Sequence, residues 1–242
     1  MTATIIMVAQ RKGGVGKTTL AAHLGVALAA QRHEVALIDT DPQASLARWH
    51  QRRETRRGEE GAGLGFAATT GWRARGVIER RAQDYDILLV DTPASAEGDV
   101  QMVMRCASLV LVPVQPSPVD VWATLLTLEM AQRERLPALL VLNRVPARAS
   151  LTASMRVQLA HYEAGLAATG IGNRVALAAA FEEGWGITEC APGSLAAEEI
   201  AALAKELLVL LPASERAHPC PAPGDQALPS DQLEPSLEPQ QS

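Results

Sequence analysis

Short, almost uniformly apolar runs recur along the chain and alternate with longer segments that mix apolar and polar residues. The runs are rich in Val, Ile and Leu, a pattern typical of strands that are buried on both faces of a sheet. Strands are therefore predicted at 4–9, 35–38, 86–90, 109–114 and 138–142, with two weaker candidates at 64–69 and 174–179.

The segments between these runs contain few helix breakers and predict helices. They cover 18–30, 44–57, 71–82, 119–135, 151–168 and 194–211, with Ser194 expected as the N-cap of the last one. Strands that alternate with helices form a parallel sheet, because each return to the same edge needs a crossover connection. The pattern therefore predicts an α/β fold with a mostly parallel central sheet and helices on both faces.

Glycines and polar residues gather just after the predicted strands. They occupy 10–19, 39–43, 91–93, 115–120 and 143–146. In a parallel sheet these segments all lie at the carboxyl edge, where the ligands of such folds bind. The pattern therefore predicts one site, built from loops that are distant in the sequence.

Composition divides the chain into a domain at 1–211 and a tail at 212–242. The tail holds seven of the fifteen prolines and is expected to be disordered. With five acidic residues against one arginine, it carries −4 of the net charge of −5. No apolar run approaches the roughly 18 residues of a membrane span, and the cysteines lack metal-ligand spacing. A cytoplasmic protein is expected.

The clearest chemical signal is the glycine-rich loop Lys12-Gly13-Gly14-Val15-Gly16-Lys17-Thr18-Thr19, between a predicted strand and a predicted helix. Its glycines allow backbone N–H groups to converge on phosphate oxygens, and the helix N-terminus adds positive potential. Lys17 is expected at the β- and γ-phosphates, and the Thr18 hydroxyl at Mg²⁺. The loop therefore predicts a P-loop NTPase that binds ATP with Mg²⁺.

Lysine is rare in this chain, and its positions sharpen the prediction. Only three lysines occur, and Lys12 and Lys17 both stand in the loop. Together with Asp39-x-Asp41-Pro42-Gln43, Asp91-x-Pro93, 112–120 and 143–145, the loop resembles the deviant-Walker ParA/MinD family, and small ParA/ParF-type partition ATPases in particular. The resemblance covers about residues 3–211. It implies a nucleotide-sandwich homodimer that forms on ATP binding, in which Lys12 reaches the partner's phosphates.

Carboxylates end two of the predicted strands close to the loop. Asp39 and Asp91, together with Thr18, suit Mg²⁺, which takes few direct protein ligands and keeps several waters. The resemblance implies that Asp41 positions or deprotonates the attacking water, as a catalytic residue beside the two loop lysines. The alternative is that Asp41 is only a turn or helix-cap residue.

Asn143 and Pro146 follow a predicted strand at the same edge of the sheet. An Asn amide can both donate to and accept from the adenine edge, so the two residues are expected at the nucleotide base. An Asn that simply forms a turn is an equally good explanation.

Two sets of arginines are candidates for contacts with phosphate. The first lies on the predicted helix 44–57, where the pattern favours a solvated helix face over a DNA footprint. Its members are Arg48, Arg52, Arg53, Arg56 and Arg57. The second set is implied by the resemblance, which places nonspecific DNA binding in the C-terminal half. Its members are Arg148, Arg156 and Arg174.

The resemblance implies a ParA-type ATPase that hydrolyses ATP slowly and binds nucleoid DNA nonspecifically as its ATP dimer. The resemblance implies a ParB-like or cargo-adaptor activating protein, and a plasmid or large protein assembly as cargo. A MinD-like membrane-cycling ATPase is an alternative, which the acidic, Pro-rich tail disfavours because such binding needs a basic amphipathic helix. A small-molecule kinase or synthetase would need Lys17 but not Lys12, and a nonhydrolysing interaction module would not need Asp41.

Overall fold

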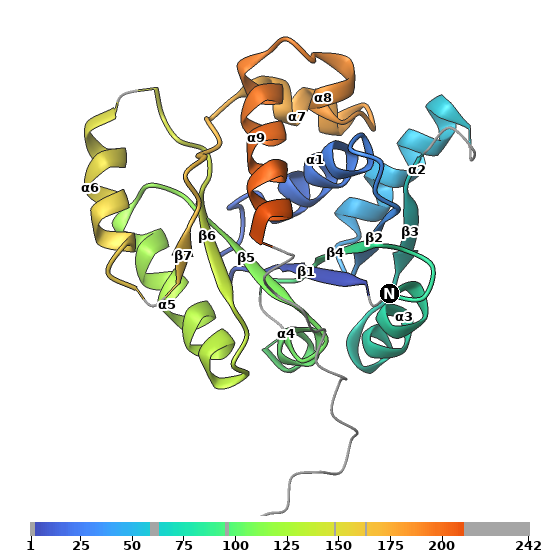
Figure 1. Cartoon of the computed structure of the whole chain (residues 1–242), viewed down its shortest axis with the longest axis horizontal. Coiled ribbons are helices and arrows are strands. Elements are labelled where there is room, and N and C mark those ends of the chain that lie inside the picture. Colours follow the sequence, from blue (N-terminus) through green and yellow to red (C-terminus); the bar gives the residue numbers. More distant parts are fainter. Residues whose placement is uncertain (1–2, 59–62, 95–96, 148, 163, 211–242) are drawn as a thin grey trace, which may run out of the picture.

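The structure, a computed structural model, describes residues 3–58, 63–94, 97–147, 149–162 and 164–210. Its centre is a seven-stranded sheet with the order β3-β2-β4-β1-β5-β6-β7, in which every neighbouring pair is parallel (Figure 1). The strands are β1 (Thr4–Val8), β2 (Val35–Asp39), β3 (Gly65–Ala68), β4 (Ile87–Asp91), β5 (Leu109–Val114), β6 (Ala138–Leu142) and β7 (Gly165–Leu166). The predicted α/β fold is confirmed, and the tail predicted at 212–242 lies outside the described residues.

Helices cover both faces of the sheet (Figure 1). One layer consists of α1 (Lys17–Ala29), α2 (Ser45–Arg57), α7 (Val175–Glu182), α8 (Ile187–Cys190) and α9 (Leu195–Leu210). The other consists of α3 (Ala74–Arg81), α4 (Glu97–Met104), α5 (Pro118–Arg133) and α6 (Ala149–Leu159). In the described ranges, no helix combines the length and apolar character that crossing a bilayer requires.

The strands are apolar throughout because each contributes to two separate cores. Along β1, Ile6 and Val8 face the core under α1 and α9, whereas Ile5 and Met7 face the core under α3, α4 and α5. Successive side chains of a strand point to opposite faces, so a strand that is covered twice has no position for a polar residue. This explains why the hydrophobic pattern locates these strands well.

After residue 150, one predicted element is wrong in its second half and another is wrong throughout. The helix predicted at 151–168 ends at Leu159, and Gly165 begins β7, where it pairs with Leu139. A glycine costs about 1 kcal/mol in a helix interior relative to alanine, so edge pairing is preferred. The strand predicted at 174–179 is helix α7, which fits its run of alanines, the best helix formers.

Other elements differ from the predictions in detail. The segment predicted as a helix at 71–82 starts with a 3-10 turn, Gly71–Arg73, before α3, and helices α4 and α8 were not predicted. Ser194 caps α9 as expected, since its hydroxyl accepts a hydrogen bond from the Ala197 N–H at 3.2 Å.

The sheet register brings the predicted site residues together at one edge. Asp39 at the end of β2 lies opposite Asp91 at the end of β4, and Asp91 in turn lies opposite Val8, just before the glycine-rich loop. Residues 10–16, 40–44 and 92–94 therefore start from neighbouring strands. The register therefore brings these three segments together at the carboxyl edge, where the site is predicted.

Candidate nucleotide-binding site

The glycine-rich loop joins β1 to α1 and exposes the first turn of that helix. Gly14 and Gly16 have φ values of 78° and 92°, which glycine adopts without the steric penalty of a Cβ. No side chain caps α1, and its first turn contains no acidic residue. Its unpaired N–H groups and positive dipole end are thus left for an external anion.

Two side-chain amides hold the carbonyl groups of this loop. The Gln115 Nε2 donates to the Gly14 carbonyl at 3.0 Å, and the Asn143 Nδ2 donates to the Val15 carbonyl at 2.7 Å. In a planar trans peptide the carbonyl and the following N–H point in opposite directions. Holding both carbonyls therefore turns the N–H groups of Val15 and Gly16 the other way. Sequence reasoning did not find this role of Gln115.

Lys17 lies almost buried at the floor of the loop. Its ammonium group donates to the Gln10 carbonyl at 3.2 Å. Burial lowers the pKa of Lys17, and the nearby carboxylates Asp91 and Asp41 act in the opposite direction. A desolvated ammonium with only one hydrogen-bond partner in the described part of the chain is suited to bind a polyanion.

Asp91 is fully buried and both of its oxygens lack a hydrogen bond of ordinary geometry within the described residues. Burial raises its pKa to about 7, and the nearby Thr18 hydroxyl opposes this rise. Burial also raises the pKa of Asp39, whose carboxylate accepts the N–H groups of Asp41 at 3.0 Å and Ala47 at 2.9 Å. An orphaned buried carboxylate beside a hydroxyl and a second carboxylate fits a hydrated Mg²⁺ ion.

Asp41 lies at the mouth of the phosphate-side cavity, which has a volume of about 530 Å³. The cavity is also lined by Lys17, Thr18 and Pro93. The Asp41 carboxylate accepts the Gln43 N–H at 2.9 Å, as an Asx turn requires. Asp41 therefore forms a turn, as the alternative interpretation states, and it also faces the cavity, as a catalytic role requires.

Lys12 points away from this cavity and pairs with α5. Its Nζ lies 2.6 Å from Oδ2 of Asp120, a carboxylate that is 1% exposed and also accepts the Ser117 hydroxyl. The Lys12 side chain itself is 36% exposed. The structure thus shows Lys12 in an ion pair within its own chain, a contact that sequence spacing alone does not reveal.

A second cavity, of about 230 Å³, adjoins the first and shares Gly16, Thr19 and Arg144 with it. Asn143 lines it, whereas Pro146 is exposed and does not. Sequence reasoning missed the part of its wall at 171–178, because the segment around 174–179 was predicted as a strand. These wall residues are Ile171, Gly172, Asn173, Arg174, Val175, Leu177 and Ala178.

The arginines of α2 bind α2 to the α7–α8 segment. Arg53 is 3% exposed and pairs with Glu189 through two hydrogen bonds of 2.7 Å, and Arg57 also reaches Glu189. Arg56 pairs with Glu183. The prediction of a solvated helix face is wrong for Arg53, which is buried, whereas Arg48, Arg52, Arg56 and Arg57 are exposed as predicted.

The arginines expected at DNA also have partners within the chain. Arg156 donates to the carbonyls of Ala167 at 3.2 Å and Ala168 at 2.9 Å. Arg174 pairs with Glu199 through Nε at 3.0 Å and a second, shorter contact. The third candidate, Arg148, lies outside the described residues.

Comparisons with known proteins agree with this geometry. Residues 6–186 match the family model described as "CobQ/CobB/MinD/ParA nucleotide binding domain". "Maintenance of carboxysome distribution protein A" of Halothiobacillus neapolitanus is 30% identical over 211 residues, which cover 84% of this chain and 95% of that protein. "Chromosome-partitioning ATPase Soj" of Thermus thermophilus is 32% identical over 236 residues, with coverage of 84% and 94%.

A solved structure gives the same result at the level of the fold. The septum site-determining protein MinD of Pyrococcus horikoshii, complexed with Mg-ADP, superposes with a TM-score of 0.70 at 20% identity. The match covers 88% of this chain and 99% of that protein.

Proposed function

The chain belongs to the CobQ/CobB/MinD/ParA family of nucleotide-binding domains, and from that premise we propose a ParA-type ATPase cycle for it. In this cycle ATP with Mg²⁺ closes a homodimer, the dimer binds nucleoid DNA nonspecifically, and hydrolysis releases it. The observation that carries the proposal is the position of Lys12 and Lys17 in one loop that faces Asp41 across a cavity.

The two adjoining cavities divide the nucleotide between them. Phosphates would lie against the exposed N–H groups of the loop and Lys17, and the base would enter the cavity lined by Asn143. Because the Nδ2 of Asn143 is already used by the Val15 carbonyl, only its Oδ1 remains to accept a hydrogen bond from the adenine amino group. Arg144 stands where the two cavities meet.

Thr18 and Asp91 would hold Mg²⁺, with Asp39 behind them. The bound ion would supply positive charge at the β- and γ-phosphates. Asp41 would orient the attacking water, and Lys17 would stabilise the charge that develops on the transferred group. Because Lys12 is paired with Asp120 in the free chain and does not reach these phosphates, hydrolysis is expected to be slow until the dimer and an activating partner complete the site.

Dimer formation requires a change at Lys12. To reach the phosphates of a second copy, its ammonium must leave Asp120, which then keeps only Ser117 as a described partner. Breaking an ion pair around a buried carboxylate is costly, so the dimer forms only when bound ATP compensates. This gives a physical reason for an ATP-dependent equilibrium between two states.

The cargo is proposed to be a large assembly, either DNA or a protein body. The match to a carboxysome distribution protein and the match to a chromosome-partitioning ATPase cover the same share of this chain, 84%. An activating partner of the ParB or cargo-adaptor kind would link the ATPase to that cargo.

Binding of the purified protein to random-sequence DNA tests the proposal. It is measured with ATP, with ADP and without nucleotide, across a salt series. We expect binding with ATP only, with an affinity that falls steeply as salt rises because basic side chains displace counterions from phosphates. Equal binding in all three states, or none with ATP at low salt, would contradict the proposed cycle.

A further inference from the structure

A third hollow shares Asp41 and Pro42 with the phosphate-side cavity and extends over α3. Its volume is about 850 Å³, within the range of ligand-binding clefts. We call it the α3 groove. Its apolar wall includes Pro42, Ala68 and Val77, and its rim carries Trp72, Arg73 and Arg80. The proposed ATPase cycle gives no role to this rim.

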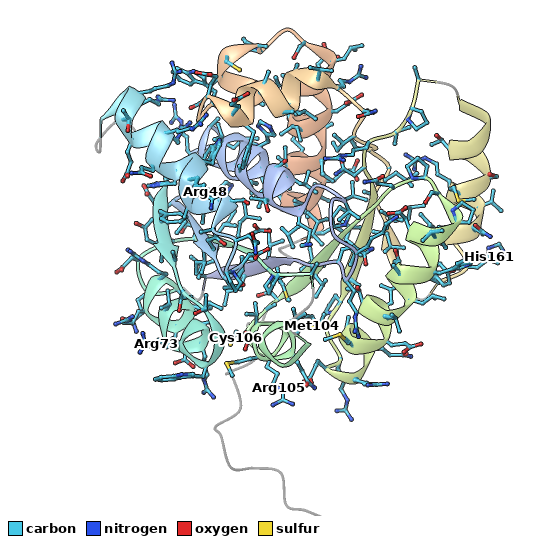
Figure 2. All side chains as sticks on the ribbon, turned by 180° about the vertical axis from the view of Figure 1, so that it is seen from behind. Arg48, Arg73, Met104, Arg105, Cys106 and His161 are labelled. Atoms are coloured by element: carbon cyan, nitrogen blue, oxygen red, sulfur yellow. The ribbon has the colours of Figure 1, made fainter. Side chains whose placement is uncertain are left out.

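The α3 side of the groove presents two cations and one aromatic ring. Arg73, in the 3-10 turn before α3, and Arg80, in α3, both line the groove and are seven positions apart, or about 10 Å along a helix. Between them, Gly76 leaves open space, with no atom within 4 Å of an added Cβ. Trp72 is 75% exposed, and the Arg73 guanidinium lies 5.3 Å from its ring centroid. Figure 2 labels Arg73 beside α3.

The opposite wall excludes some ligands. Asp39 and Asp41 contribute carboxylates there, so a nucleic-acid strand, which has a negative charge at every nucleotide, would be repelled at one side of the groove. A peptide can place its acidic residues at the arginines and neutral residues at the carboxylates. The groove therefore favours an extended peptide with spaced acids and with prolines or leucines for Trp72.

The chain itself contains such a peptide beyond its last described residue. The tail includes Leu228-Pro229 and two copies of a Leu-Glu-Pro triplet, at 233–235 and 237–239. Asp231 and Glu234 are three positions apart, one turn of a polyproline II helix, so they share an edge with a spacing of about 9 Å. This nearly equals the spacing of Arg73 and Arg80.

The tail is long enough to reach the groove from the end of α9. Twenty-one positions separate Leu210 from Asp231. An extended segment of that length spans about 65 Å. A globule of this size has a diameter of roughly 45 Å. The segment is longer than this diameter and can reach most of the surface from the end of α9, so the groove is within reach of the same chain.

We propose that tail residues 228–239 bind in the α3 groove of their own chain, with Asp231 and Glu234 at Arg73 and Arg80 and Pro or Leu side chains on Trp72. The docking requires no nucleotide.

Quenching of Trp72 fluorescence by acrylamide tests the docking in the full chain without nucleotide. A Trp122→Phe background removes the other highly exposed tryptophan among the described residues. We expect the double variant Asp231→Arg/Glu234→Arg to raise the quenching constant about twofold, because the ring loses its cover. The matched tail variant Glu215→Arg/Asp225→Arg reverses the same number of charges outside the docking segment and should leave the constant unchanged.

A charge exchange tests the pairing itself. Arg80→Glu alone should raise the quenching constant, and its combination with either Asp231→Arg or Glu234→Arg should restore it in at least one case. The surface variant Arg133→Glu, at an exposed site outside the groove, makes the same change in net charge as Arg80→Glu and controls for it. Equal quenching in all chains would overturn the proposal. So would protection that disappears on dilution, because that would place the tail of a second copy, or another partner, in the groove.

Discussion

The two ends of the nucleotide cleft are built from different kinds of groups. At the phosphate end, charged side chains are withheld from water, so burial lowers the pKa of Lys17 and raises that of Asp91 to about 7. At the base end, Glu199 lies close to Arg174, whose hydrogen bonds lower the pKa of Glu199 against the effect of burial. Within the described residues, Lys17 and Asp91 at the phosphate end have no ion pair, whereas Glu199 and Arg174 at the base end are paired with each other.

The difference shows where the fold gives up stability for function. A buried ion without a partner destabilises the folded chain until a ligand supplies the missing charge. A paired ion already contributes to the fold and has little left to offer a ligand. Removing the unpaired charge of Asp91 should therefore stabilise the protein and abolish activity, whereas removing the paired charge of Glu199 should destabilise the protein and leave activity nearly unchanged.

Replacement of Asp91 by Asn tests this contrast most strongly. Hydrolysis should fall by about 1,000-fold, since a buried carboxylate at the metal is lost. The free energy of unfolding at pH 8 in EDTA should rise by roughly 2–4 kcal/mol, because a desolvated charge disappears. A steady-state ATPase assay measures the loss of hydrolysis, and urea denaturation measures the free energy of unfolding.

The matched control lies at the base end. Glu199→Gln removes one hydrogen-bonded carboxylate and should lower the free energy of unfolding by about 1 kcal/mol or less, with little change in hydrolysis. A destabilised Asp91→Asn protein would show that the contrast between the two ends is wrong.

Acidification should lower the free energy of unfolding through His23, which lines the base-side cavity. His23 of α1 is buried and accepts the Ile187 N–H at 3.1 Å, while its other ring nitrogen lies 3.0 Å from the Leu177 carbonyl. Burial lowers its pKa from 6.5 to about 4. The unfolded chain therefore binds more protons between these values, and lowering the pH from 6.5 to 4 should remove about 3 kcal/mol of stability.

Urea denaturation across this pH range, with His23→Gln as the non-titrating reference, measures the effect. The difference in unfolding free energy between the two chains should shrink as the pH falls. A constant difference from pH 7 to pH 4 would mean that His23 does not control this window.

Lys12→Ala tests the proposed contact of Lys12 with the phosphates that a second copy binds. ATP-dependent dimerisation and hydrolysis should both fall by about 100-fold, since a cation at the phosphates is lost. The variant should also be less stable, because the Asp120 carboxylate loses its ion pair.

Analytical ultracentrifugation with ATP and an ATPase assay provide the measurements. Adding Asp120→Asn should restore stability without restoring the dimer. Dimerisation of Lys12→Ala at the wild-type level would exclude a role of this lysine across the interface.

Substitutions of Gln115 and Asn143, whose amides hold the loop carbonyls, should give the smallest effects and should distinguish phosphate binding from base binding. Gln115→Ala should lower the affinity for ATP, GTP and ADP alike by about 10-fold. The substitution frees the Gly14 carbonyl, and Gln115 does not contact the base in the proposed site. Asn143→Ala should do the same and in addition reduce the preference for adenine over guanine. Calorimetric titration with the three nucleotides distinguishes the outcomes. An unchanged adenine preference in Asn143→Ala would remove Asn143 from the base site.

The same contrast explains what the sequence could predict. The phosphate end is local: β1, the glycine loop and α1 are consecutive, and Asp39 and Asp91 end strands that their apolar runs locate directly. The base end depends on the loop before α7, whose Ala-rich segment was predicted as a strand.

Partners that are distant in the sequence could not be inferred either. Lys12 and Asp120 are 108 positions apart, and Arg53 and Glu189 are 136 apart. Nothing in the local pattern selects these pairs among the other acids and bases of the chain. Only the packing of α5 and α8 against their neighbours does.

The ion pair of Lys12 and Asp120 also sets a threshold. Asp120 competes with the phosphates of a second copy for the Lys12 ammonium. Because Asp120 is on the same chain as Lys12, its effective concentration is high, typically millimolar. The proposed dimer forms only when the Lys12–Asp120 ion pair breaks. The fraction of dimer should therefore depend steeply on the local concentration of the protein. A weaker contact at position 120 would lower the density at which the switch responds, and this makes Asp120 the residue through which the sensitivity of the cycle could be tuned.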